Sequence, residues 1–158
     1  MSQPLHFLCG GWTRSSGDKT LDVHEPATGQ VIGTIADGTQ ADVDHAVAAA
    51  REAFDHGAWG RTSALERSRM LIRLGTLIQR DAERLGRIEA RDTGKPASVA
   101  KADIVALARY FEFYGGAADK LHGETVPYLN GYFVTVTPEP HGVTGHILPW
   151  NYPAQMFG

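Results

Sequence analysis

The chain has 158 residues, of which 42% are hydrophobic, 21% charged and 9% aromatic, a composition typical of one globular domain. Its 15 basic and 18 acidic residues give a net charge of −3, which argues against a nucleic-acid-binding surface because such surfaces need a basic patch. The single cysteine excludes an internal disulfide and a multi-cysteine zinc site. No apolar run reaches the roughly 18 residues of a membrane span, and the first residues lack a signal-peptide pattern. We therefore expect a cytoplasmic protein that binds neither nucleic acid nor membrane.

The first 35 residues are typical of short strands joined by turns. Residues 5–8 and Trp12 flank the turn residues Gly10 and Gly11, which predicts two short strands around a glycine turn. Residues 26–29 form a turn cluster before the alternating pattern of residues 31–35, and this region is interpreted as a hairpin. Two-stranded hairpins are only marginally stable alone.

Helices are predicted from residue 39 to residue 122, where apolar residues recur at steps of three and four. Thr39 and Asp42 fit the start of the first helix. Ser63 and Glu66 form a capping box at the start of the second.

Two further helices are expected before the pattern changes. One ends at residues 92–96, where Gly94 ends the last turn and Pro96 blocks continuation. The other extends from about residue 98 to residue 122 and contains Gly115 and Gly116. Because glycine weakens a helix, we interpret this pair as a site of close helix packing.

After Pro127 the apolar period changes from about 3.6 to 2. Residues 132–137 predict a half-buried strand, and residues 143–148 predict a second one. A proline-braced loop, residues 149–153, follows the second strand. The last five residues begin a new element, which suggests an N-terminal piece of a larger protein.

Most candidate reactive residues have a simpler interpretation. Cys9 is placed in a short strand without a neighbouring base, so we interpret it as a small buried hydrophobe. The seven histidines show no metal-ligand spacing, and no metal site is predicted.

Asn151 is the exception, because its amide lies between Pro149 and Pro153 directly after a predicted strand. Open α/β sheets bind ligands beyond the carboxyl ends of their strands, and a fixed amide is suited to donate a hydrogen bond to a developing oxyanion. Spacing alone nevertheless favours a structural Asn that closes the turn.

The loop Pro149-Trp150-Asn151-Tyr152-Pro153, following Gly142-Val143-Thr144-Gly145, resembles the signature of the NAD(P)-dependent aldehyde dehydrogenase superfamily. Residues 25–32 resemble the early Asn-Pro-Ala-Thr-Gly turn of that family, with Glu25 in place of the asparagine. Further segments match in chain order, namely residues 44–54, 67–77, 92–96 and 110–127. The resemblance therefore covers almost the whole chain and corresponds to the N-terminal portion of the family.

This resemblance implies an α/β fold, in which hairpins and helices lead into the first strand of a Rossmann-like cofactor-binding sheet that is incomplete here. Residues 1–131 would form the lead-in of the cofactor-binding domain, residues 132–138 an oligomerisation (bridging) strand, and residues 139–158 the start of the dinucleotide-binding sheet. The implied partners are the remainder of the subunit and further copies, as a homodimer or homotetramer.

The same resemblance implies oxidation of a small-molecule aldehyde to a carboxylic acid with NAD or NADP. Ile147, Leu148, Pro149 and Trp150 would line the nicotinamide and ribose part of the cofactor site. Asn151 would stabilise the oxyanion that forms when a cysteine thiolate attacks the aldehyde. The catalytic cysteine and glutamate of the family match no residue here, so we expect the chain alone to be inactive.

A non-catalytic assembly module is the alternative. A truncated relative would keep the helices and the strand at residues 132–137 and offer them to partners by strand addition.

Overall fold

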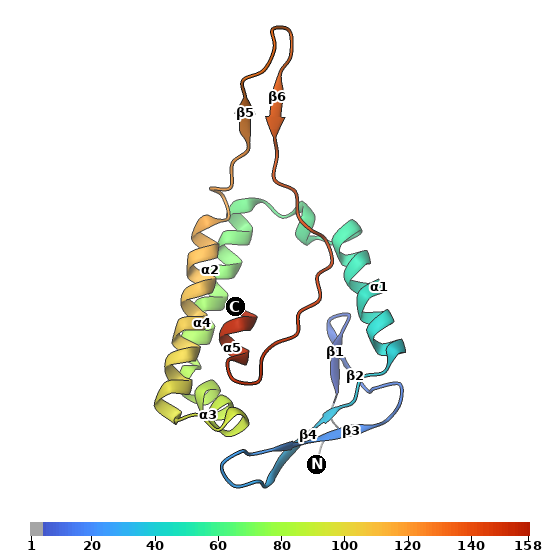
Figure 1. The fold of residues 1–158 in the computed structure, drawn as a ribbon, viewed down its shortest axis with the longest axis vertical. Helices are drawn as coiled ribbons and strands as arrows, with labels where there is room; N and C mark the ends of the chain where they lie inside the picture. Colours follow the sequence, from blue (N-terminus) through green and yellow to red (C-terminus); the bar gives the residue numbers. More distant parts are fainter. Residues whose placement is uncertain (1–4) are drawn as a thin grey trace.

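The computed structural model describes residues 5–158 as a mixed α/β chain of hairpins and helices (Figure 1). In chain order the elements are β1 (His6–Leu8), β2 (Gly11–Thr13), β3 (Thr20–His24), β4 (Val31–Ala36), α1 (Gln40–His56), a 3₁₀ turn (Trp59–Arg61), α2 (Ala64–Arg80), α3 (Ala82–Thr93), α4 (Ala97–Ala117), β5 (Glu124–Val126), β6 (Val134–Val136) and α5 (Pro153–Phe157). Within the described range, no helix is long and apolar enough to span a bilayer.

Both predicted N-terminal hairpins are confirmed. β1 and β2 pair antiparallel with Phe7 opposite Trp12, and the two rings meet edge to face with their centroids 5.1 Å apart. β3 and β4 pair antiparallel over a longer stretch, with an irregular register at Val23 and His24. Gly29 has a φ of 70° in the turn between these strands, a conformation that favours glycine.

The capping residues of the first two long helices act as predicted. The Asp42 backbone N–H donates to the Thr39 hydroxyl, and the Asp42 carboxylate accepts from the Thr39 backbone N–H at 2.9 Å. The Ser63 and Glu66 pair forms the same reciprocal arrangement at the start of α2. Asp42 also accepts from the backbone N–H of Ser16 at 3.0 Å, which ties the turn before β3 to α1.

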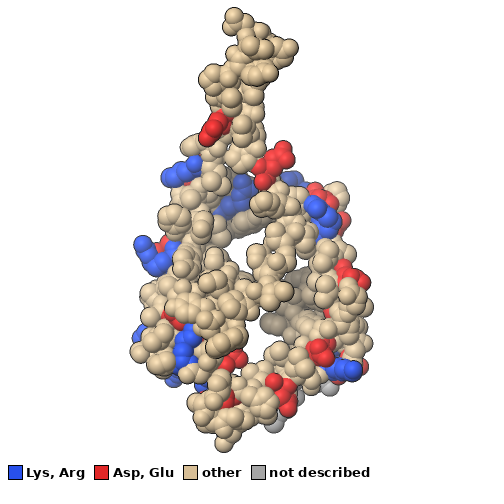
Figure 2. All heavy atoms as spheres, in the orientation of Figure 1, with Lys and Arg blue, Asp and Glu red and all other residues tan. Residues whose placement is uncertain are grey.

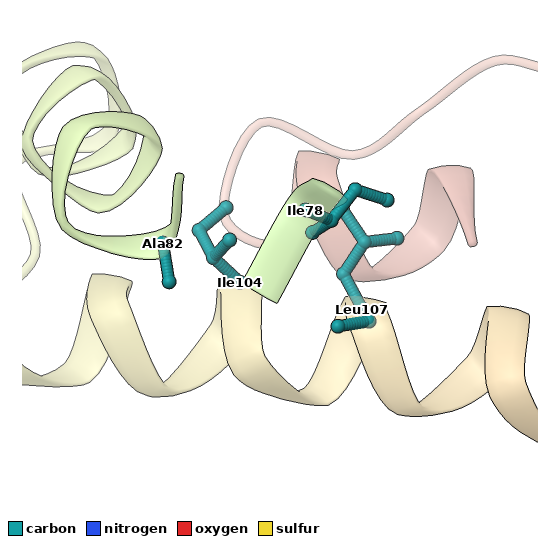
Figure 3. Packing of buried hydrophobic residues seen from close by; sticks show 5 residues of the cluster. Ile78, Ala82, Ile104 and Leu107 are labelled. Carbon is teal, nitrogen blue, oxygen red and sulfur yellow. The ribbon is translucent and has the colours of Figure 1, made fainter. Parts of the chain in front are cut away.

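The small core lies where α2, α3 and α4 meet, and α5 packs against α4 beside it (Figure 3). The buried hydrophobic cluster consists of Ile78, Ala82, Ile104, Leu107 and Ala108.

Gly115 allows α4 to approach α2 closely, as predicted. An added Cβ there would lie 2.9 Å from Ile72 Cγ1 and 3.1 Å from the Ser68 carbonyl oxygen. The same prediction is wrong for Gly116, where an added Cβ would meet nothing within 4 Å. The helix also ends earlier than expected, at Ala117.

The predicted strand at residues 132–137 is shorter and is paired. It forms β6, which pairs antiparallel with β5, so that Glu124 lies opposite Val136 and Val126 opposite Val134. This β5–β6 hairpin projects from the end of the α2–α4 layer (Figure 1), and Figure 2 shows no charged side chain at its tip on the face in view. Tyr132 and Phe133 are 69% and 82% exposed, so the strand is not half-buried as expected.

The predicted strand at residues 143–148 does not form in this chain. A strand is defined by hydrogen bonds to a neighbour, and the three two-stranded sheets of the described chain are built only from residues 6–36 and 124–136. Residues 139–152 instead run without ladder partners between the α2–α4 layer and α1 to reach α5 (Figure 1).

The molecule is much more open than a compact monomer of its size. Its accessible surface is 11904 Å². A compact monomer of 17.1 kDa has about 7,700 Å². Figure 2 shows the openness as gaps on both sides of the segment that leads to α5. Large apolar faces of α1, α2 and the β5–β6 hairpin are therefore left in contact with solvent.

Candidate functional site

The five predicted site residues follow one another in the segment that enters α5. Ile147 is fully exposed, Trp150 is 82% exposed and Leu148 is 41% exposed. Pro149 and Asn151 are also exposed, and Tyr152 caps α5, whose first residue is Pro153. Proline suits this first helical position because its φ is preset and no N–H is needed there. The loop of residues 149–153, the site loop, therefore has a proline-restricted backbone at both ends. The side chains of Trp150 and Asn151 between the two prolines are exposed.

Tyr152 and Gln155 connect the loop and α5 to the helical layer. The Gln155 side-chain N–H donates to Asp103 Oδ1 at 3.0 Å, across 52 positions of sequence. The Lys95 ammonium lies 4.5 Å from the centre of the Tyr152 ring, within the range of a cation–π contact.

Lys95 is itself held by two buried carboxylates. Its Nζ lies 2.8 Å from Glu89 Oε1 and 2.7 Å from Asp103 Oδ2. Burial opposes the charged form of Lys95, but the hydrogen bonds to Asp103 and Glu89, together with their charges, raise its pKa above the ordinary lysine value. Lys95 thus stays a cation within salt-bridge distance of both side chains.

The sequence patterns did not identify Lys95, Asp103 and Gln155 as functional residues. Gln155 offered a signal, because it is the one polar side chain among the apolar residues 153–157. Lys95 and Asp103 carried no signal of their own, since each is an ordinary charged residue until the fold buries it.

The interpretation of Cys9 as a buried hydrophobe is wrong. Cys9 is exposed in the turn between β1 and β2, with a φ of 53°. Its Sγ lies 3.4 Å from His45 Nε2, so a base is also present nearby, contrary to expectation. Between residues 5 and 158, no three His, Cys, Asp or Glu side chains gather where they could hold a metal ion.

A cavity of about 720 Å³ lies elsewhere, between the β3–β4 hairpin and α3. Its lining includes Val23, Ile32 and Ile88 together with three arginines of α3, and it includes none of the five predicted site residues. The cavity and the loop are therefore separate features.

The loop presents an apolar surface with one amide side chain beside it. The exposed side chains of Ile147, Leu148, Pro149 and Trp150 offer an apolar surface on which a flat ring can rest. The neighbouring Asn151 amide supplies an exposed N–H donor. An apolar surface beside an amide donor is the chemistry that a flat aromatic cofactor and a developing oxyanion need.

Comparison with known proteins shows the family to which the chain belongs. The model of the aldehyde dehydrogenase family matches residues 12–158. The mitochondrial aldehyde dehydrogenase family 2 member B4 of Arabidopsis thaliana is 44% identical over 152 residues, which are 96% of this chain and 28% of that protein.

Solved structures agree in fold as well. A putative aldehyde dehydrogenase from Burkholderia cenocepacia is 58% identical with a TM-score of 0.93, over 97% of this chain and 32% of that one. The NAD⁺ complex of a Bacillus cereus aldehyde dehydrogenase is 36% identical with a TM-score of 0.94, over 99% of this chain and 32% of that one. The chain thus spans about 30% of the length of these relatives. It belongs to the aldehyde dehydrogenase family, of which it represents the N-terminal portion.

Proposed function

We propose that this chain is the N-terminal part of an enzyme that oxidises an aldehyde to a carboxylic acid with NAD or NADP. The observation that carries the proposal is the exposed Asn151 amide, held between two prolines beside an apolar surface. Family membership and the NAD⁺ complex of the Bacillus cereus relative support it.

In this proposal, Asn151 donates its side-chain N–H to the aldehyde oxygen as that oxygen becomes negatively charged. The charge develops only when the nucleophilic cysteine, supplied by the rest of the subunit, attacks the carbonyl carbon. Asn151 therefore lowers the barrier without binding the ground state more tightly. When bound, NAD(P) would supply the hydride acceptor. Its nicotinamide and ribose would be held by Ile147, Leu148, Pro149 and Trp150, which would keep water from that face.

The rest of the subunit has a defined place in this proposal. It covers the apolar surface that makes the accessible area of the chain about 1.5 times that of a compact monomer. Residues 139–158 begin the dinucleotide-binding sheet. In the complete subunit, residues 143–148 gain a strand partner from the remainder of the subunit. Residues 1–131 form the lead-in of the cofactor-binding domain.

Assembly of subunits is proposed through the β5–β6 hairpin, which contains the bridging strand of residues 132–138. Its exposed Tyr132 and Phe133 and its unpaired outer edges support strand addition between copies, giving a homodimer or homotetramer. A cytoplasmic location stays a prediction, because the relatives include a mitochondrial protein.

The test uses a chimera in which residues 1–158 replace the matching segment of the Burkholderia cenocepacia protein. The 58% identity between the two segments favours a compatible interface. Asn151→Ala should lower kcat for aldehyde oxidation by roughly 10²–10³-fold and leave NAD⁺ affinity nearly unchanged.

Trp150→Ala serves as the paired variant, because it should mainly raise the KM for the cofactor. If Asn151→Ala lowers the melting temperature but not kcat per folded molecule, Asn151 is structural and the proposed role is wrong.

The aldehyde itself is best sought with a panel. The relatives include proteins named for benzaldehyde (Antirrhinum majus), retinal (Homo sapiens) and indole-3-acetaldehyde (P. syringae). We propose aromatic and hydrophobic aldehydes of this kind as the first substrates to test, with acetaldehyde as the small reference.

A further inference from the structure

One buried charge cluster joins three distant parts of the sequence next to the site loop. Gly94 ends α3 in the left-handed conformation, with a φ of 76°, and thereby turns the chain so that Lys95 points back across α3 and α4. There the Lys95 ammonium lies between Glu89 of α3 and Asp103 of α4, whose residues are only 6% and 3% exposed. Removing Lys95 would leave both buried carboxylates without their cationic partner.

The same cluster reaches the residues on the C-terminal side of Asn151. Asp103 accepts from Lys95 through one carboxylate oxygen and from the Gln155 amide through the other. Lys95 also faces the ring of Tyr152, the residue that follows Asn151. The two carboxylate oxygens of Asp103 thus connect α3 and α4 to α5.

This connection matters because α5 cannot hold itself in place. It has five residues, far fewer than the roughly 12–15 that even a favourable isolated helix needs in water. The residues before Asn151 have no strand partner in the described chain, and in the proposed complete subunit residues 143–148 gain one. The C-terminal side of Asn151 is held within this chain, by the contacts of Tyr152 and Gln155 with the cluster and by the packing of Ala154 and Phe157 beside α4.

We propose that Lys95, Asp103 and Gln155 are positioning residues that fix the Asn151 amide where the oxyanion forms. This inference rests on the proposed function of Asn151. None of the three touches the substrate, and each acts through the placement of α5.

Gln155→Leu tests the proposal, since it keeps the size of the side chain and removes the amide, which donates to Asp103 and accepts from the Tyr110 hydroxyl of α4. Gln40→Leu is the matched control. Gln40 is an exposed glutamine whose amide donates to Asp44 Oδ1 at 2.8 Å, on α1 and away from the loop. In the chimera, Gln155→Leu should lower kcat roughly 10- to 100-fold, because a small misplacement of a catalytic group has effects of that size. Gln40→Leu should leave kcat unchanged.

A double-mutant cycle separates positioning from general destabilisation. If Gln155 acts through Asn151, then Gln155→Leu should change kcat less than about twofold when Asn151 is already alanine. An equal fractional loss in both backgrounds, or no loss in the presence of Asn151, would overturn the positioning role. If Asn151→Ala alone leaves kcat unchanged, the proposed function fails, and the inference fails with it.

Hydrogen exchange provides a readout that needs no activity. In α5 the Met156 backbone N–H donates to the Tyr152 carbonyl at 3.1 Å. In the 158-residue chain, Gln155→Leu should speed exchange of this amide at least several-fold, whereas Gln40→Leu should not. Unchanged protection in Gln155→Leu would show that the cluster does not hold α5.

Discussion

The two adjacent glycines near the end of α4 should respond in opposite directions to the same substitution. Replacing glycine by alanine inside a helix stabilises it by up to about 1 kcal/mol through backbone entropy. At Gly116, which is exposed, the new methyl group meets nothing within 4 Å. Because this position is close to the helix end, we expect Gly116→Ala to raise the free energy of unfolding by about 0.5 kcal/mol.

At Gly115 the steric cost exceeds that gain. The new Cβ would lie 2.9 Å from Ile72 Cγ1, 3.1 Å from the Ser68 oxygen and 3.2 Å from the Ile72 nitrogen. Two of these atoms belong to the α2 backbone, so α2 itself must move. Overpacking of this kind costs up to about 3 kcal/mol. Subtracting the helix gain leaves a net loss of about 2 kcal/mol for Gly115→Ala.

Urea unfolding of the 158-residue chain, followed by far-UV circular dichroism, measures both variants against the parent chain. The midpoint should fall for Gly115→Ala and rise slightly for Gly116→Ala, each with an unchanged slope. Gly116→Ala is the control for any general effect of alanine in this turn of α4. A Gly115→Ala variant as stable as the parent would refute the close approach of α2 and α4.

The pKa of Asp42 is held well below its ordinary value by the backbone N–H groups of Thr39 and Ser16, so its contribution to stability is present above about pH 4 and is lost as the pH falls further. The free energy of unfolding of the parent chain should therefore fall as the pH is lowered below about 4. In Asp42→Asn this decrease with pH should be smaller. Leu107→Ala, at a core residue that is 6% exposed, should lower the free energy of unfolding by about 2–5 kcal/mol in urea titrations. The 158-residue chain should elute as an oligomer and bind a hydrophobic dye, whereas a dye-silent monomer would contradict the open structure.

Local chemistry explains which parts of the fold could be predicted from the sequence. The helix starts at Thr39 and Ser63 were predictable because a cap and its partner lie within three residues. The end of α3 was predictable for the same reason, since Gly94 and Pro96 act on their own backbone.

Several features that depend on distant partners were not predicted. β5 carries the β-branched residues Thr125 and Val126 between Gly123 and Pro127, a signal that could have indicated a strand, but its role depends on pairing with β6. Residues 143–148 have strand-like composition and no neighbour to pair with in the described chain. A sequence pattern indicates the conformational preference of one segment, whereas strand pairing requires a second segment.

The site divides in the same way. Asn151 and the four residues before it could be proposed as site residues because they form one contiguous motif. The cluster of Lys95, Asp103 and Gln155 spans 60 positions of sequence and exists only once α3, α4 and α5 are packed together.

The rate of NADH formation from the aldehyde panel, measured side by side for the 158-residue chain and for the chimera, tests the central claim most directly. Covalent catalysis needs an activated nucleophile, and no residue of this chain matches the catalytic cysteine of the family. We expect no rate above a heat-treated control for the chain and steady aldehyde-dependent turnover for the chimera. Turnover by the chain alone, or a folded chimera that binds NAD⁺ and does not oxidise any aldehyde, would refute the proposed function.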